Sequence, residues 1–252
     1  MREDICKYCG QHTKLIKSHI VPKSLYQIDK WGPYTGIDAK QVFIDKVHSQ
    51  NGFKEPLLCE ICDNKLGYLD RYASNFFLKD IPNMPISSWP ELSFYELDSS
   101  RFNYNNLRRF FISLMWRVSI CKRVDYSLGK YEAIASDILK YNIPDDKDLF
   151  LPVIYHRKSN TPFDYLSSIY SIEFMGNKEL CVRFPEYEII LIKNKNLCDD
   201  PDNAQVLSYM FSRERLFVFR INSITHVDQW FIKTLKDLNK KYDLKRIFRK
   251  KE

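Results

Sequence analysis

Residues 57–65 read LLCEICDNK, and the Cys-x-x-Cys pair at their centre, Cys59 and Cys62, repeats the spacing of Cys6 and Cys9 near the start of the chain. Two residues between thiolates allow one turn to point both sulfur atoms at the same ion. Four thiolates complete the tetrahedral shell of a structural Zn²⁺ ion. The alternative is two chance pairs of buried free thiols, which the repeated spacing disfavours. We therefore expect one Zn²⁺ site built from these four cysteines.

The insert between the two cysteine pairs, residues 10–58, exceeds the roughly 15–20 residues that separate the pairs of a simple zinc ribbon. We expect this insert to carry the function. A helix is predicted to begin near Cys62 and to continue through residues 65–78. Its apolar residues recur at helical spacing, namely Leu66, Leu69, Phe76 and Phe77.

Further elements of this region follow one another in a definite order. His19-Ile20-Val21-Pro22 comes after the first cysteine pair, Asn51 lies within the insert, and the second pair precedes the predicted helix. In this order they resemble the zinc-containing, treble-clef kind of HNH (ββα-metal) endonucleases over about the first 70 residues. They are also similar to HNH proteins of prokaryotic defence islands. The resemblance implies that His19 activates water, that Asn51 holds the loop, and that Asp63, after the last cysteine, binds a catalytic metal.

Hydrolysis of a phosphodiester needs a base within reach of water and a cation beside the scissile phosphate. His19 suits the role of base because its unperturbed pKa lies near 6.5. The cation expected at Asp63 is Mg²⁺ or Mn²⁺. Each residue also has a structural interpretation. His19 could be a polar residue satisfied at the end of a strand, and Asp63 could simply complement the dipole of the helix whose first turn it occupies.

Ser18 departs from the family pattern, which has Asp, Glu or His immediately before the general base. A hydroxyl is a poor ligand for a hard cation. Three hypotheses stay open. Ser18 contributes through its hydroxyl or a water molecule, or Asp70 or His48 completes the site, or the pocket is degenerate and binds nucleic acid without cutting it. Asn64 either contacts the metal or phosphate or supports the turn.

The net charge of +7 has the sign expected of a nucleic-acid-binding protein, and almost all of the excess lies in residues 233–252. Ordinary surface charge or a tail that docks on a partner are the alternatives. Arg108 and Arg109, on a predicted helix, could face a partner or DNA. The candidate phosphate contacts are Lys17, Lys23, Lys65 and Arg71 beside the expected site, and Lys240, Lys241, Lys245 and Arg246 in the basic tail.

The fold class expected is α+β, with an HNH-like zinc domain over residues 1–80, a Pro-rich connection over 81–100 and a second α+β domain over 101–252. In the second domain, helices are predicted over residues 106–123 and 128–142. Strand-like runs follow, and we expect their sheet to be antiparallel. These runs cover residues 149–155, 167–175, 179–184, 187–193 and 216–222. The last element, from about residue 227 to 248, is predicted to be a basic helix.

Composition and motifs narrow the class of function. No apolar run approaches the ~18–20 residues of a membrane span, and the start has no signal-peptide pattern, so we expect a cytoplasmic protein. Seven cysteines in that compartment argue against a disulfide framework. No Walker loop, GxGxxG or GxSxG motif occurs. The favoured hypothesis is an HNH endonuclease acting on DNA, or on RNA, in antiphage defence. The alternatives are a non-catalytic zinc module that binds nucleic acid or protein, and an accessory subunit that acts with a protein partner.

Overall fold

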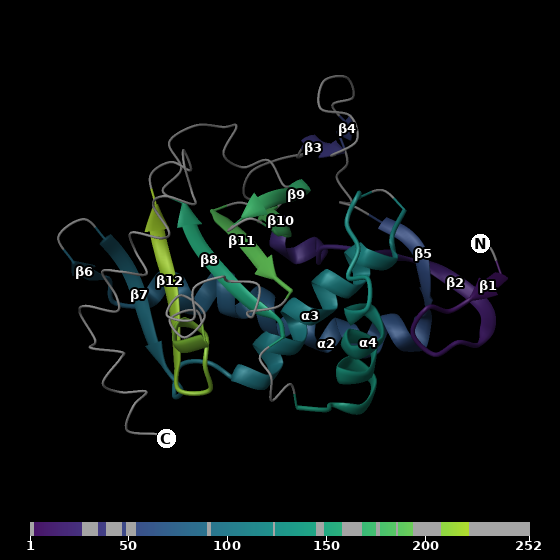
Figure 1. The fold of residues 1–252 in the computed structure, drawn as a ribbon, viewed down its shortest axis with the longest axis horizontal. Helices are drawn as coiled ribbons and strands as arrows, with labels where there is room; N and C mark the ends of the chain where they lie inside the picture. Colours follow the sequence, from purple (N-terminus) through teal and green to yellow (C-terminus); the bar gives the residue numbers. More distant parts are fainter. Residues whose placement is uncertain are drawn as a thin grey trace.

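The computed structural model describes most of the chain, and it has an α+β fold. A small sheet lies at one end and a large sheet at the other, with helices between them (Figure 1). The described residues are 3–26, 35–38, 47–48, 54–89, 92–122, 124–144, 149–157, 168–174, 177–184, 186–193 and 208–221. The expected basic helix over residues 227–248 lies outside them. Within these residues no helix combines the length and apolar character needed to cross a membrane.

The small sheet is antiparallel and has the order β1-β2-β5. Its strands are β1 (Glu3–Ile5), β2 (His12–His19) and β5 (Lys54–Cys59), and a 3-10 helix (Lys23–Tyr26) follows β2. Helix α2 (Glu60–Asn75) begins directly after β5, which confirms the predicted helix and starts it two residues before Cys62. It buries Leu66, Leu69 and Ala73 along one face. A π-helical turn (Phe76–Asp80) and a 3-10 turn (Ile81–Asn83) extend it.

The large sheet has nine strands in the order β4-β3-β9-β10-β11-β8-β12-β7-β6. The five strand-like runs of the second half are confirmed as strands. They are β8 (Leu151–Arg157), β9 (Ser168–Phe174), β10 (Asn177–Phe184), β11 (Tyr187–Ile192) and β12 (Arg215–Ile221). The others are β3 (Thr35–Asp38), β4 (Val47–His48), β6 (Ser87–Trp89) and β7 (Leu92–Asp98).

The expectation of an antiparallel sheet is wrong for two pairings, and the sheet is mixed. Strand β12 runs parallel to β8, and β3 runs parallel to β9. Tight turns impose antiparallel pairing only on strands that they join directly, as between β9, β10 and β11. Strand β12 returns after a long connection, which leaves its direction beside β8 unconstrained by any turn.

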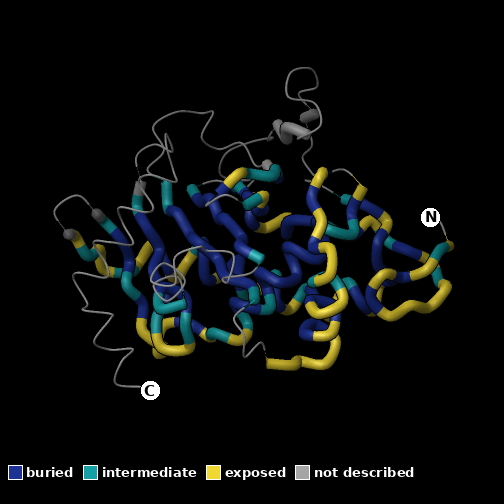
Figure 2. The backbone as a smooth tube through the Cα atoms, viewed as in Figure 1, coloured by how far each residue is buried: buried dark blue, intermediate teal, exposed yellow. Residues whose placement is uncertain are grey.

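Helix α3 (Tyr104–Ile120) is the central helix of the molecule, and α4 (Tyr131–Tyr141) packs against it. Both were predicted. The side chain of Asn103 caps α3 by accepting a hydrogen bond from the Asn106 amide at 3.0 Å. Because α3 packs against α2, α4 and β8, eleven of its 17 residues are buried. Figure 2 shows this buried region continuing from α3 into the strands of the large sheet.

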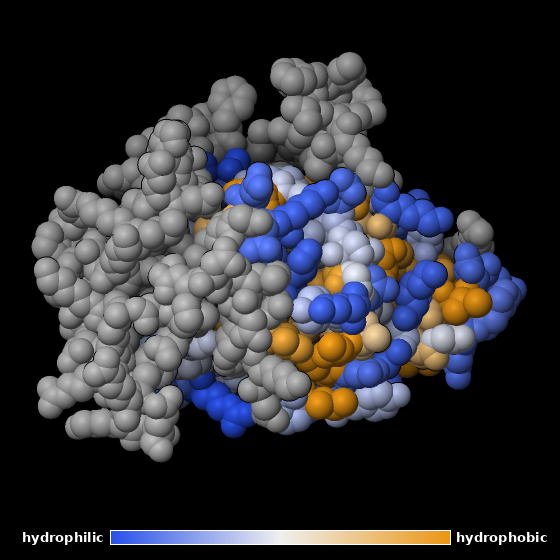
Figure 3. Space-filling model, viewed as in Figure 1, coloured by the Kyte–Doolittle hydropathy of each residue, from blue (hydrophilic) through white to orange (hydrophobic). Residues whose placement is uncertain are grey.

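Helix α4 covers α3 on the outside and is exposed on its other face. The surface of the molecule in this view mixes hydrophilic and hydrophobic residues (Figure 3). On α4 and just beyond it, Ile134 and Ile143 are exposed. The helix ends at Asn142, whose φ of 54° is the left-handed conformation that stops a helix before Pro144.

The Pro-rich stretch 81–100 contributes strands to the large sheet. Strand β7 pairs with β12 and β6 pairs with β7, so this stretch forms one edge of the sheet. Strand β3, from the N-terminal part, pairs with β9. One continuous hydrophobic core contains residues from both sides of the stretch. The ring of Phe77, for example, lies 5.3 Å from that of Phe184 and 5.1 Å from that of Tyr187.

Candidate metal centre and the His19 site

Four cysteines from two distant segments come together beside the small sheet. Their Sγ atoms all lie within 4.8 Å of one another. Cys6 and Cys9 belong to the turn between β1 and β2, which Gly10 closes at a φ of +76° by donating its amide to the Cys6 carbonyl at 2.9 Å. Cys59 ends β5, and Cys62 lies in the first turn of α2. The cluster can hold a metal ion such as Zn²⁺, whose soft tetrahedral coordination matches four thiolates.

The surroundings of the sulfur atoms favour the thiolate form at Cys6 and oppose it at Cys62. Burial raises the pKa of Cys6, but the backbone amides of Cys9, Cys59 and Tyr8 together lower it to about 7. The Cys59 amide donates to the Cys6 Sγ atom at 3.3 Å. Burial and the neighbouring cysteines raise the pKa of Cys62. A divalent cation would relieve the repulsion among these thiolates, which is why such clusters bind metal with release of protons.

His19 is the last residue of β2 and lies opposite Lys54, the first residue of β5. The pairing of the two strands shifts register between Ile16 and Lys17, as at a β-bulge. The Nε2 atom of His19 is buried and has no hydrogen-bond partner in the part of the chain that the structure describes. This ring nitrogen is therefore enclosed by the protein and unpaired within the described residues.

Charged groups from three elements act on the imidazole. Burial is the largest effect and lowers the pKa of His19, and Lys54 lowers it further. Asp63, in the first turn of α2, raises the pKa of His19 and so offsets part of this lowering. Arg117 from α3 lowers this pKa and Asp70 from α2 raises it, both more weakly. With the pKa below its ordinary value of 6.5, His19 is neutral at pH 7 and can accept a proton.

Arg117 connects α3 to this site. It is 1% exposed, and its guanidinium binds both carboxylate oxygens of Asp70, at 2.7 and 3.0 Å. The same group donates to the main-chain carbonyl of His19 at 2.9 Å. Asp70, a candidate for completing the metal site, is thus engaged by an ion pair. Arg117 itself was not predicted to belong to the site, because it follows His19 by 98 residues in the sequence.

Ser18 faces the interior and is fully buried. Its Oγ atom has no hydrogen-bond partner among the described residues. The residue opposite it in β5 is Glu55, whose carboxylate accepts the backbone amide of Lys122 at 3.1 and 3.2 Å. An acidic group is therefore present across the strand pair from Ser18, and the sequence motif gave no sign of it.

The other predicted site residues lie on α2, on or after β2, on β4, or outside the described residues. Asn64, Lys65 and Arg71 are exposed on α2, and Lys17 and Lys23 are exposed on and after β2. His48 belongs to β4, which pairs with β3. Asn51, Lys240, Lys241, Lys245 and Arg246 lie outside the described residues. Among the residues that are described, the four cysteines form the one group of three or more His, Cys, Asp or Glu side chains close enough to share a metal ion.

Comparison of the chain with models of known protein families, with curated proteins and with solved structures finds no match. The functional interpretation therefore depends on the chemistry of the two sites.

Proposed function

We propose that the protein is a metal-dependent endonuclease that hydrolyses phosphodiester bonds in DNA, or in RNA, at His19, with Zn²⁺ on the four cysteines as a structural ion. One observation carries the proposal. The buried, unpartnered Nε2 atom of His19, at the end of β2, lies within electrostatic reach of Asp63 in the first turn of α2. Two antiparallel strands followed at once by a helix, β2, β5 and α2, are also the order of elements in the ββα-metal nucleases that the sequence resembles.

Each residue around the imidazole would have a distinct task. Neutral His19 would accept a proton from the attacking water through Nε2. Arg117 would fix the main chain of His19, and Asp70 would fix Arg117. Lys54 adds positive charge where a phosphate would bind. Asp63 supplies one hard oxygen ligand for Mg²⁺ or Mn²⁺, and such an ion would stabilise charge on the phosphate.

The second candidate is a zinc module that binds nucleic acid or protein without cutting. Two observations favour it. Ser18 takes the place of an acidic ligand, and Asp70 is already paired with Arg117. With Asp63 alone, the described residues supply a single carboxylate, the lower end of the one or two that usually bind a catalytic Mg²⁺.

Cleavage assays separate the two candidates. Plasmid and single-stranded substrates are incubated with Mg²⁺ or Mn²⁺ and with wild type, His19→Ala or His12→Ala, after zinc content has been matched. His12 is an exposed histidine at the other end of β2 and serves as the control. We expect His19→Ala to lose about 10²–10⁴-fold in rate and His12→Ala to lose nothing.

Two results would decide against catalysis at His19. Equal cutting by His19→Ala and wild type would reject His19 as the base. No cutting by the zinc-loaded wild type on any substrate, with nucleic acid or a copurifying protein still bound, would favour the non-catalytic module or an accessory subunit of a defence system.

A further inference from the structure

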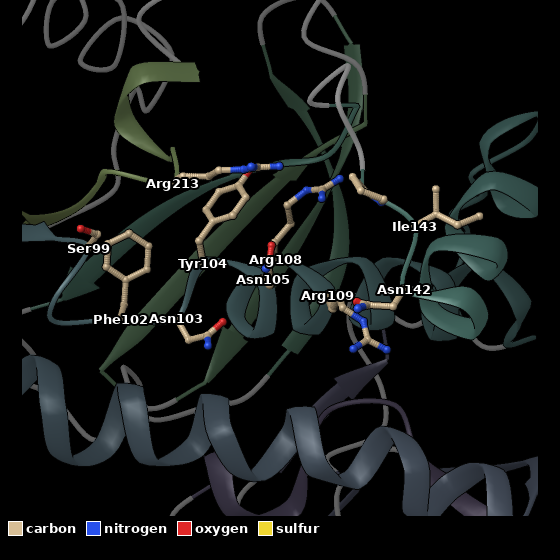
Figure 4. A pocket seen from close by; sticks show the side chains of 11 residues that line it. Ser99, Phe102, Asn103, Tyr104, Asn105, Arg108, Arg109, Asn142, Ile143 and Arg213 are labelled. Carbon is tan, nitrogen blue, oxygen red and sulfur yellow. The ribbon is translucent and has the colours of Figure 1, made fainter.

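A second site lies at the N-terminal end of α3. There a cavity of about 420 Å³ opens between the start of α3, the end of α4 and the turn before β12 (Figure 4). Small-molecule sites in proteins have volumes of about 300–1,000 Å³. The residues that line this cavity include Phe102, Tyr104, Arg108, Arg109, Asn142 and Arg213. None of them belongs to the His19 site or to the cysteine cluster.

The lining of this cavity is strongly cationic. It contains three arginines, and no carboxylate occurs among its described residues. Figure 4 shows the side chains of Arg108 and Arg213 extending toward the same region beside Tyr104. The guanidinium groups of Arg108 and Arg213 lie on the same side of α3, and an anion between them would be attracted to both. The guanidinium of Arg109 points to the other side of α3, toward the end of α4. The first turn of the 17-residue helix α3 adds its positive end to the same place.

Two of the arginines, Arg108 and Arg109, are held in position by the fold. Arg108 is 5% exposed, and its guanidinium lies 6.0 Å from the centre of the Tyr104 ring. Arg109 donates through Nη2 to the Leu139 carbonyl at 3.0 Å, while its buried Nε atom has no partner among the described residues. Arg213 is exposed at the mouth of the cavity. Guanidinium groups bind phosphate through paired hydrogen bonds.

We propose that this cavity binds a phosphate-bearing small molecule of nucleotide size. Arg108 and Arg213 would hold the phosphate. The rings of Phe102 and Tyr104 form the apolar part of the lining, and an aromatic base would pack against their edges, because the Tyr104 ring already contacts Phe211 and Arg108. The side-chain amides of Asn103, Asn105 and Asn142 offer donors and acceptors for the edge of that base. The proposal does not depend on nuclease activity, because the cavity and His19 share no residue.

Calorimetric titration of the full chain with ATP, AMP, inorganic phosphate and adenosine tests the proposal. We expect ATP and AMP to bind, adenosine to bind at least tenfold more weakly, and added salt to weaken the nucleotides. Arg213→Gln should weaken nucleotide binding about tenfold or more, since a hydrogen-bonded charge is lost. Lys14→Gln removes an exposed charge from β2, outside the cavity, and should leave binding unchanged.

A short oligonucleotide, with and without a 5′-phosphate, distinguishes a free nucleotide from the end of a nucleic-acid strand. Binding of the phosphorylated strand alone, lost in Arg213→Gln, would overturn the small-molecule proposal in favour of strand-end recognition. Absence of binding by every probe, or equal binding by wild type and Arg213→Gln, would overturn the site altogether. Unliganded melting temperatures of the variants show that each is folded.

Discussion

The hydroxyl of Ser18 is buried and has no hydrogen-bond partner among the described residues. In the nuclease family that the sequence resembles, a metal ligand occupies this position. Burying an unsatisfied hydroxyl costs about 1–3 kcal/mol. We expect Ser18→Ala to leave the free energy of unfolding unchanged or to raise it by up to about 1 kcal/mol, measured by urea denaturation. If the protein cleaves nucleic acid as proposed, the variant should keep that activity. A folded Ser18→Ala protein that has lost cleavage would assign the hydroxyl to the metal site.

The ion pair between Arg117 and Asp70 should contribute far more to stability than an exposed one. Removing one partner of a buried pair costs about 3–5 kcal/mol, and exposed pairs contribute about 0–1 kcal/mol. The side chains of Arg117 and Asp70 are 2% and 18% exposed, against 58% and 84% for Lys178 and Asp125. We expect Asp70→Asn to lower the free energy of unfolding by about 3 kcal/mol in urea denaturation.

Asp125→Asn is the matched control for Asp70→Asn, with an expected loss below about 0.5 kcal/mol. Because Arg117 also holds the His19 carbonyl, Asp70→Asn should slow any cleavage at temperatures where the variant is folded. Equal losses of stability in the two variants would contradict the role given to the Arg117 pair.

Strand β10 carries a buried carboxylate that should make the stability of the protein depend on pH. Glu179 is 1% exposed, and burial raises its pKa from 4.5 to about 7, against the opposing effect of the Lys193 amide and side chain. Between these two values the folded protein binds a proton that the unfolded chain releases. Its contribution to stability is therefore complete below about pH 4.5 and is lost as the pH rises toward about 7.

Glu179→Gln removes this titration and should stabilise the protein above neutral pH. We expect a gain of about 1–3 kcal/mol at pH 8 relative to wild type, and almost none at pH 4.5. The amide oxygen can still accept the Lys193 backbone amide, which Glu179 binds at 3.2 Å. Denaturation curves at the two pH values measure the difference, and an equal effect at both would show that Glu179 is not the titrating group.

The helices and strands that could be predicted are those with a local signal. Periodic apolar residues define α2 and α3, and β-branched runs define β8 to β12. The parallel pairing of β12 with β8 and the strands within residues 81–100 could not be predicted in this way. Their pairing is decided by what lies beside them in the folded sheet.

The same distinction between local sequence signals and long-range contacts applies to the candidate sites. The spacing of Cys59 and Cys62 predicted their convergence with the first cysteine pair, because ligand spacing is a local property. The contacts of His19 with Lys54 and Arg117 join residues far apart in the chain, and no motif marks them. The arginine-lined cavity likewise forms where α3, α4 and the turn before β12 meet.

Removal of metal from the cysteine cluster should affect much more than one turn. The cluster ties the turn between β1 and β2 to the junction of β5 and α2, and its core is continuous with the rest of the molecule. Thiolate zinc sites contribute about 10–16 kcal/mol in small zinc-binding peptides, as much as the whole stability of a typical domain. We expect a strong chelator to lower the melting temperature markedly and to unfold the small sheet.

Zinc content by elemental analysis and circular dichroism before and after chelation measure this effect. Restoring Zn²⁺ should restore the melting temperature, which separates loss of metal from irreversible damage. A purified chain that carries no zinc and keeps the same melting temperature with and without chelator would reject the structural role of the cluster.

The central position of α3 also determines how the protein exchanges its amide protons with solvent. Eleven of the 17 residues of α3 are buried, and α2, α4 and β8 cover it. Amides in such a helix exchange with deuterium only when the whole core opens, whereas those of an outer helix such as α4 exchange through partial opening. The slowest-exchanging amides of α3 should therefore report the global free energy of unfolding directly, without denaturant.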